Sequence, residues 1–157
     1  MKNFQWFAAL LLAAAATHGF TQNSTTMENK KVAVVQQVYT EFGKGNVQGV
    51  LDLLTDDILW IDPGFPDIPY AGKRTGKAEV TDFFMKMGST VEFTRFEPQL
   101  FVNEGNYVVV KGFFTGKNRA TQKSFETEWM MIWEVVEGKI KYYQAYIDTR
   151  NVAAAMK

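Results

Sequence analysis

Apolar residues recur at three- and four-residue steps in three segments, and this spacing predicts three amphipathic helices. The first covers residues 27–42, follows a polar linker at residues 21–26, and ends at Gly43. The second is short and begins at Asn46, a residue type that commonly caps helices, and the third begins after Thr75. The three apolar stripes consist of Val32, Val35, Val38, Tyr39 and Phe42; of Val47, Val50, Leu51 and Leu54; and of Val80, Phe83, Phe84 and Met87.

Between and after these helices the apolar period changes to two, which predicts strands rich in β-branched and aromatic residues. The first ends at Pro63, because proline cannot donate to a sheet ladder. The predicted strands are Ile58–Asp62, Val91–Phe96, Leu100–Asn103, Tyr107–Thr115, Phe125–Val136 and Ile140–Asp148, and a short tail helix follows them. This order predicts an α+β fold: a cone-shaped, curved, antiparallel or mixed sheet of five to six strands, packed against three N-terminal helices.

The first twenty residues have the pattern of a signal peptide. Lys2 supplies a positive charge, and an apolar run follows over residues 7–16. This run is shorter than the roughly 20 residues that a membrane-spanning helix needs. We therefore expect residues 1–20 to be removed on export, to the periplasm or outside the cell, leaving one domain at residues 27–157 without stable membrane association. A soluble N-terminal helix is the alternative.

Composition excludes several classes of chemistry. Seventeen basic residues balance seventeen acidic ones, so no net field favours binding to nucleic acid. The chain contains no cysteine, and its one histidine, His18, lies in the predicted signal peptide. Catalytic triads, thiol nucleophiles and histidine-bound metals are therefore not expected, and the prediction is a site without metal or cofactor. Aromatic residues make up 15% of the chain, which favours a pocket for a small apolar ligand.

Two carboxylates are the candidates for proton transfer. Asp62 follows Trp60 on one strand face, where apolar surroundings would raise its pKa towards a useful value. Alternatively, Asp62 only ends the strand by bonding nearby backbone amides. Asp148 ends the last strand, and alternation places Tyr146 on its face. Asp148 could instead cap the tail helix or pair with Arg150.

The remaining candidates form a predicted pocket wall. Tyr39 is a candidate polar partner of the base, and the predicted ligand-binding residues are Trp60, Phe65, Trp129, Met131 and Tyr146. The alternative for each ring is core packing or a subunit interface. Lys73, Arg74 and Lys77 lie beside a predicted helix N-terminus, where anions can bind, or they form a solvated face.

Three stretches together resemble the SnoaL-like, nuclear-transport-factor-2-like superfamily, which includes ketosteroid isomerase. They are residues 45–57, residues 62–76 with their Asp-Pro step and glycines, and residues 137–148 with their Tyr-Ile-Asp ending. The resemblance implies that Asp62 corresponds to the isomerase's general base. The positions of the isomerase's two oxyanion donors correspond to Val38 and Met131, which cannot donate. The resemblance, together with the surplus of aromatic residues, also implies a homodimer formed through the open sheet face.

These observations predict a pocket enzyme that isomerises, cyclises or hydrates a small apolar carbonyl compound by acid–base chemistry. Asp62 would be the base, with Tyr39, Tyr146 or Asp148 as polar partners. The alternative is an exported ligand-binding or protein-interaction domain whose pocket does no chemistry.

Overall fold

The computed structural model of the chain describes residues 17–157. The predicted signal peptide, residues 1–20, therefore lies almost entirely outside the described residues. Within the described part, no helix is both long enough and apolar enough to cross a membrane.

Four helices are present: α1 (Thr17–Gly43), α2 (Val47–Asp52), α3 (Gly76–Thr90) and α4 (Thr149–Ala155). The first three lie where the apolar spacing predicts them, except that Leu54 belongs to the first strand and not to the second helix. Helix α4 is the predicted tail helix. However, α1 begins ten residues earlier than expected and includes residues 21–26, so the predicted linker is helical. This segment contains no glycine or proline, and its polar residues therefore permit a continuous helix.

The six strands form one mixed sheet in the order β2-β1-β6-β5-β4-β3. Their bounds are β1 (Leu54–Asp62), β2 (Gly72–Thr75), β3 (Val91–Glu104), β4 (Tyr107–Asn118), β5 (Ser124–Val136) and β6 (Lys139–Ile147). All neighbours are antiparallel except β1 and β6, which are parallel. The α+β class and the curved sheet are thus confirmed.

Two details of the sheet differ from the prediction. Residues 91–104 form one strand rather than two, with register shifts on either side of Thr94 and of Gln99. Pro98 is tolerated within this strand because β3 is an edge of the sheet, where a missing N–H breaks no second ladder. The short strand β2 was not predicted, because only one of its four side chains, Arg74, is buried.

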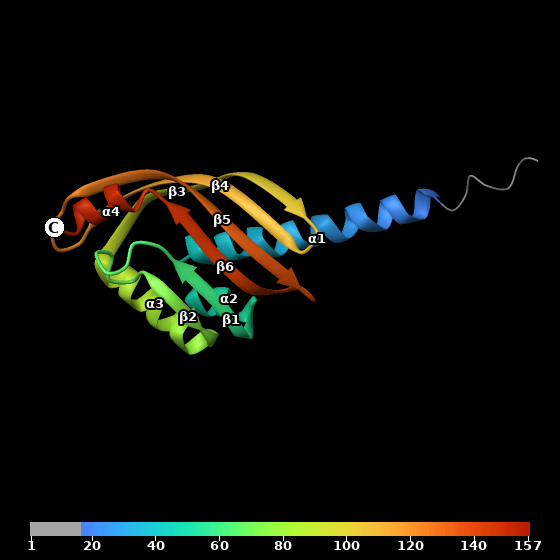
Figure 1. Cartoon of the computed structure of the whole chain (residues 1–157), viewed down its shortest axis with the longest axis horizontal. Helices are drawn as coiled ribbons and strands as arrows, with labels where there is room; N and C mark the ends of the chain where they lie inside the picture. Colours follow the sequence, from blue (N-terminus) through green and yellow to red (C-terminus); the bar gives the residue numbers. More distant parts are fainter. Residues whose placement is uncertain (1–16) are drawn as a thin grey trace, which may run out of the picture.

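The sheet has two different faces, which we call inner and outer. Helices α1, α2 and α3 lie against the concave inner face, and α4 lies at one end of the sheet beside the C-terminus (Figure 1). Burial alternates strictly along β4 and β5, with the inward residues buried and the outward ones partly or fully exposed. The core therefore sits between the inner face and the three helices.

Candidate functional site

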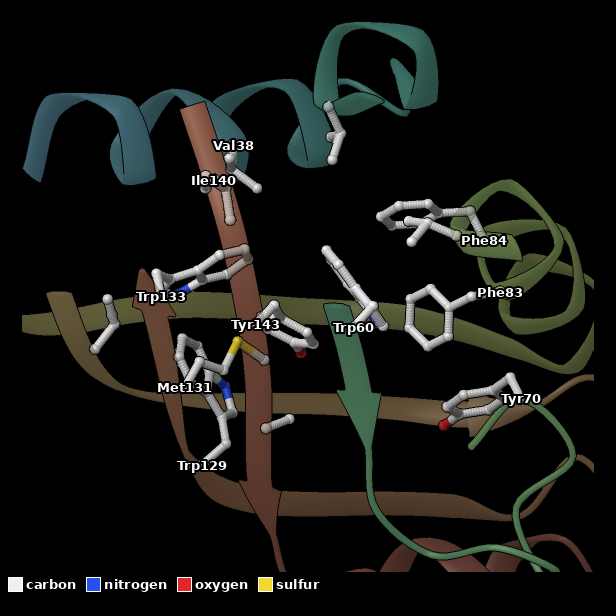
Figure 2. Packing of buried hydrophobic residues seen from close by; sticks show 14 of the residues in the cluster. Val38, Trp60, Tyr70, Phe83, Phe84, Trp129, Met131, Trp133, Ile140 and Tyr143 are labelled. Carbon is white, nitrogen blue, oxygen red and sulfur yellow. The ribbon is translucent and has the colours of Figure 1, made fainter. Parts of the chain in front are cut away.

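A small, strongly apolar cavity lies between the inner face and the helices. Its volume is ≈ 70 Å³. Small-molecule sites usually measure about 300–1,000 Å³, so a ligand of ring size requires some of these side chains to move. The wall is made mainly of aromatic rings from α1, α3 and the strands; Figure 2 shows Trp60, Phe83, Phe84, Trp133 and Tyr143 converging on one region.

Asp62 is the carboxylate that lines this cavity. Along β1 the side chains of Ile58, Trp60 and Asp62 are all buried, so the period-two pattern carries the final residue to the inner face. Pro63 follows and contributes no N–H to the ladder. The side chain is only 7% exposed and accepts a hydrogen bond from the Tyr143 hydroxyl at 3.3 Å.

Burial raises the pKa of Asp62 from its ordinary value of 3.8 to about 7. The hydrogen bond from Tyr143 and the positive charge of Arg74 act in the opposite direction, because both favour the ionised form. A carboxyl group with a pKa near neutrality is partly ionised at pH 7. It can therefore both accept and return a proton, which a base must do in an isomerisation.

Three tyrosines share the cavity with Asp62. The Tyr39 hydroxyl accepts a hydrogen bond from Trp133 Nε1 at 3.0 Å and donates to Met131 Sδ at 3.4 Å. The hydroxyl groups of Tyr70 and Tyr143 both point towards β1 (Figure 2). Burial raises the pKa of each of these three tyrosines well above its usual value, so all three remain protonated donors at neutral pH.

Arg74 adds a buried positive charge next to this cluster. It lies directly opposite Trp60 in the pairing of β1 with β2, so both side chains are on the inner face. The Arg74 side chain is 8% exposed, and its guanidinium carbon lies 5.3 Å from the centre of the Phe83 ring. Burial of both Asp62 and Arg74 is uncommon, since ionisable residues are rarely this enclosed.

Four residues predicted for the site lie outside the cavity, and three of them are exposed. Phe65 is 75% exposed, because the loop after Pro63 turns its ring outwards and directs Ile68 inwards. Tyr146 is 47% exposed on the outer face, since the inward residues of β6 are Tyr143, Ala145 and Ile147. The predicted position of both rings in the pocket wall is therefore wrong.

Asp148 is the third of these residues. It is exposed and accepts a hydrogen bond from the backbone N–H of Arg150 at 3.0 Å, as the N-cap of α4. Of the two alternatives for Asp148 outside the site, the structure therefore shows the one in which it caps the tail helix. The cavity holds one of the two predicted carboxylates, Asp62.

Trp129 is buried but does not line the cavity. Its ring lies over the backbone of Gly112 on β4, where an added Cβ would be 2.1 Å from Trp129 Cζ2. The same ring stacks on Phe96 at 5.1 Å between centroids, and it is Phe96 that faces the cavity. Of the predicted pocket residues, Trp60 and Met131 are in the wall, and so is the predicted partner Tyr39.

Sequence reasoning missed Tyr70 and Tyr143 as cavity neighbours of Asp62. It placed Arg74 beside a helix N-terminus and did not predict that its charge lies near this carboxylate. For Tyr143 a signal existed, because Tyr143, Ala145 and Ile147 alternate with Gln144 and Tyr146. The exposed Tyr146, however, makes both faces of β6 look aromatic. For Tyr70 and Arg74 no periodic signal existed, because a loop and a four-residue strand are too short to show one. Within residues 17–157, no three His, Cys, Asp or Glu side chains lie close enough to hold a metal ion.

Comparisons with known proteins identify the fold family. An NTF2-like protein from Burkholderia xenovorans is 33% identical, with 83% of this chain and 98% of that chain covered and a TM-score of 0.76. An NTF2-like protein from Burkholderia thailandensis is 26% identical, with 81% of this chain and 97% of that chain covered and a TM-score of 0.74. A protein from Xanthomonas campestris that is provisionally named a polyketide cyclase is 16% identical, with 83% of this chain and 98% of that chain covered and a TM-score of 0.67.

The search of curated proteins returned no match. The SnoaL-like domain family, in contrast, matches residues 35–143, a segment that contains Tyr39, Asp62, Arg74 and Tyr143. This chain therefore belongs to the SnoaL-like domain family, with the NTF2-like fold.

Proposed function

We propose that this protein is an acid–base enzyme that moves a proton within a small, mostly apolar carbonyl compound, as in isomerisation or cyclisation, with Asp62 as the base. The observation that carries the proposal is a nearly buried carboxyl group in an apolar cavity, with a pKa of about 7. Family membership supports it, because structural neighbours include proteins provisionally named polyketide cyclases.

The chemistry follows from the wall of the cavity. As a carboxylate, Asp62 removes a proton from a carbon next to the carbonyl group and then returns it. In an isomerisation the proton returns to a different carbon. Tyr143 donates to Asp62 and limits how far burial raises its pKa. Tyr39 donates to a sulfur, a weak acceptor, and so remains available to a better acceptor on a ligand.

The test is the conversion of 3-cyclohexenone to 2-cyclohexenone, followed by ultraviolet absorbance. Wild-type protein should accelerate it, and Asp62→Asn should lower kcat/KM by at least about 100-fold, in the range typical of a lost general base. Asp148→Asn is the matched control, since that carboxylate lies outside the cavity, and it should retain wild-type activity. Equal rates for wild type and Asp62→Asn would refute the proposal.

A second candidate is a ligand-binding domain without chemistry. The small volume and apolar wall of the cavity favour it, because they suit a ligand held by burial alone. The carboxyl titration of Asp62, measured by carbon-13 NMR, separates the two functions. A midpoint near 4, with unchanged binding of a small aromatic ligand in Asp62→Asn, would select the binding domain.

We also propose export and a homodimer. Export rests on the pattern of residues 1–20, and N-terminal sequencing of protein recovered from the periplasm or medium tests it. The dimer rests on exposed apolar side chains of the outer face, among them Leu100, Val102, Met130 and Tyr146. Analytical ultracentrifugation of wild-type protein at micromolar concentration would reveal the dimer.

A further inference from the structure

Two buried N–H donors belong to directly paired residues of β1 and β2 whose side chains are on the inner face, and the charge of one of them acts on Asp62. Arg74 Nη1 and Trp60 Nε1 are enclosed by protein, and neither has a hydrogen-bond acceptor among the described residues. The great majority of buried polar atoms have a partner, so two such donors on directly paired residues call for an explanation.

The position of these donors relates them to the base. Trp60 and Asp62 point to the same face because they are two residues apart on β1, and Arg74 is the cross-strand partner of Trp60. Arg74 and Trp60 both pack against Phe83, with the guanidinium carbon 5.3 Å and the Trp60 ring 5.3 Å from the centre of its ring. The nitrogen-bearing end of the Trp60 ring faces Phe83 (Figure 2).

We infer that Arg74 and Trp60 form an oxyanion-binding site, which holds the carbonyl oxygen of the substrate while Asp62 removes a proton from the adjacent carbon. This inference rests on the proposed function and assigns its substrate class: enolisable ketones or phenol-like compounds with one oxygen at the edge of a flat apolar body. Preorganised donors of this kind act where negative charge develops during the reaction.

The charges balance through the step. Before reaction the Asp62 carboxylate and the Arg74 guanidinium cancel each other. When Asp62 takes the proton, the electrons of the broken C–H bond form a carbon–carbon double bond, and the carbonyl π electrons move to oxygen. The negative charge then lies on the enolate oxygen, beside Arg74 and Trp60 Nε1. Return of the proton to carbon reforms the carbonyl group and the Asp62 carboxylate.

The alternative is that Arg74 is structural, a cation held over the face of Phe83. Two features of the pair favour the binding role. A structural cation over a ring gives no role to the enclosed Trp60 Nε1, whereas a bound ligand oxygen would supply the acceptor that both donors lack. The charge of Arg74 also reaches Asp62, where it lowers the pKa against the effect of burial.

The test uses Asp62→Asn, which stands in for the state after proton transfer, in which Asp62 is neutral and the counter-charge of Arg74 is on the ligand oxygen. The probe is 4-nitrophenol, whose absorbance near 400 nm reports whether it binds as the anion. 4-Nitrotoluene is its uncharged counterpart. Asp62→Asn should bind 4-nitrophenolate at least about tenfold more tightly than the Asp62→Asn/Arg74→Met double variant, because one charge-assisted hydrogen bond is lost. 4-Nitrotoluene should bind both equally.

Three further variants make the result specific. Trp60→Phe in the Asp62→Asn background keeps an aromatic ring but removes Nε1, and should weaken 4-nitrophenolate binding about threefold or more. Lys73→Met should change nothing, since Lys73 neighbours Arg74 on β2 but points away from the inner face. Arg74→Lys keeps the charge without the planar fork and should bind at an intermediate level.

A measurement without any ligand completes the test. In the wild-type background, Arg74→Met should raise the titration midpoint of Asp62, seen by carbon-13 NMR, because the nearby positive charge is gone. Equal 4-nitrophenolate affinity with and without Arg74, or an unchanged Asp62 midpoint, would overturn the inference. If Asp62→Asn binds the anion as expected but wild type isomerises no ketone, the proposed function fails while the anion site remains.

Discussion

The two faces of the sheet use neighbouring residues of the same strands for opposite purposes. On β4 and β5, Gly112 and Trp129 face inwards as a register pair, and the adjacent pair Lys111 and Met130 faces outwards. The inner pair permits a tryptophan ring to lie on the backbone. The outer pair belongs to a row that continues from Leu100 on β3 to Tyr146 on β6. The inner face is tightly packed, and the outer face is exposed to solvent.

The difference shows where this molecule accommodates polar groups. The outer face carries charges in contact with water, such as the ion pair of Lys111 with Glu128 at 2.8 Å, which contributes little to stability. The inner face encloses Asp62 and Arg74, whose burial is costly. Buried ionisable groups with a shifted pKa, such as Asp62 beside this cavity, are common at functional sites.

Asp62→Asn should change the pH dependence of stability more than any other single substitution. The folded protein holds the Asp62 proton up to about pH 7, whereas the unfolded chain releases it near pH 4. The wild-type free energy of unfolding should therefore fall as pH rises from about 4 to about 7, relative to Asp62→Asn, by roughly 4 kcal/mol. Urea unfolding across this pH range measures the difference.

Asp148→Asn makes the same change in an exposed carboxyl group and is the matched control for replacing a carboxylate by an amide. If the Asp62→Asn and wild-type curves are parallel instead, Asp62 is not in the desolvated environment that the inner face provides.

Gly112→Ala tests the close fit of the inner face. The new Cβ would lie 2.1 Å from Trp129 Cζ2 and 2.5 Å from the backbone oxygen of Glu97, and the second atom cannot rotate away. We expect a loss of about 3 kcal/mol in the free energy of unfolding, at the upper end of overpacking effects. Tryptophan fluorescence during denaturant unfolding reports it.

Gly88→Ala is the matched control. Gly88 lies in α3 with no heavy atom within 4 Å of its added Cβ, so alanine should leave stability equal or improve it by up to about 1 kcal/mol. Similar losses for both substitutions would show that the inner face is not tightly packed around Trp129.

The fold was predictable from the sequence where elements are long enough to show a period. The helix stripe that includes Val35 and Val38 predicted the correct element and the correct buried face. The alternation along β4 and β5 predicted the correct elements. The N-terminal boundary of α1 was missed because a polar segment without glycine or proline is compatible with either helix or linker. β2 was missed because four residues carry almost no pattern.

The site was predictable only in part, and for a physical reason. The position of Asp62 on the inner face followed from alternation with Trp60 along one strand. Asp148 follows β6 as a helix cap, and there alternation no longer determines the direction of the side chain. Arg74 comes close to Asp62 through the pairing of β1 with β2, and single-sequence patterns do not specify such pairing between strands.

Asp148→Ala isolates the contribution of this carboxylate outside the cavity. Loss of the cap bond to the Arg150 N–H should lower the free energy of unfolding by about 1 kcal/mol. The proposed isomerase activity, measured at a temperature where the variant is folded, should remain that of wild type. A large loss of activity without a loss of stability would show that Asp148 takes part in the reaction. Asp62 would then not be the only carboxylate on which activity depends.

Met130→Lys is expected to have the smallest effect on folding and to act only on association. Met130 is 49% exposed and lies beside Lys111 in the outer row, so the new charge repels its neighbour but loses little buried area. The free energy of unfolding measured on the monomer should change by less than about 0.5 kcal/mol. If the outer face is the dimer interface, two added charges would meet across a symmetric contact, and sedimentation should show monomer where wild type shows dimer.

Met85→Lys, at a 64% exposed methionine on α3, provides the matched control and should leave the dimer intact. A dimer that survives Met130→Lys but not Met85→Lys would move the interface from the sheet to the helices.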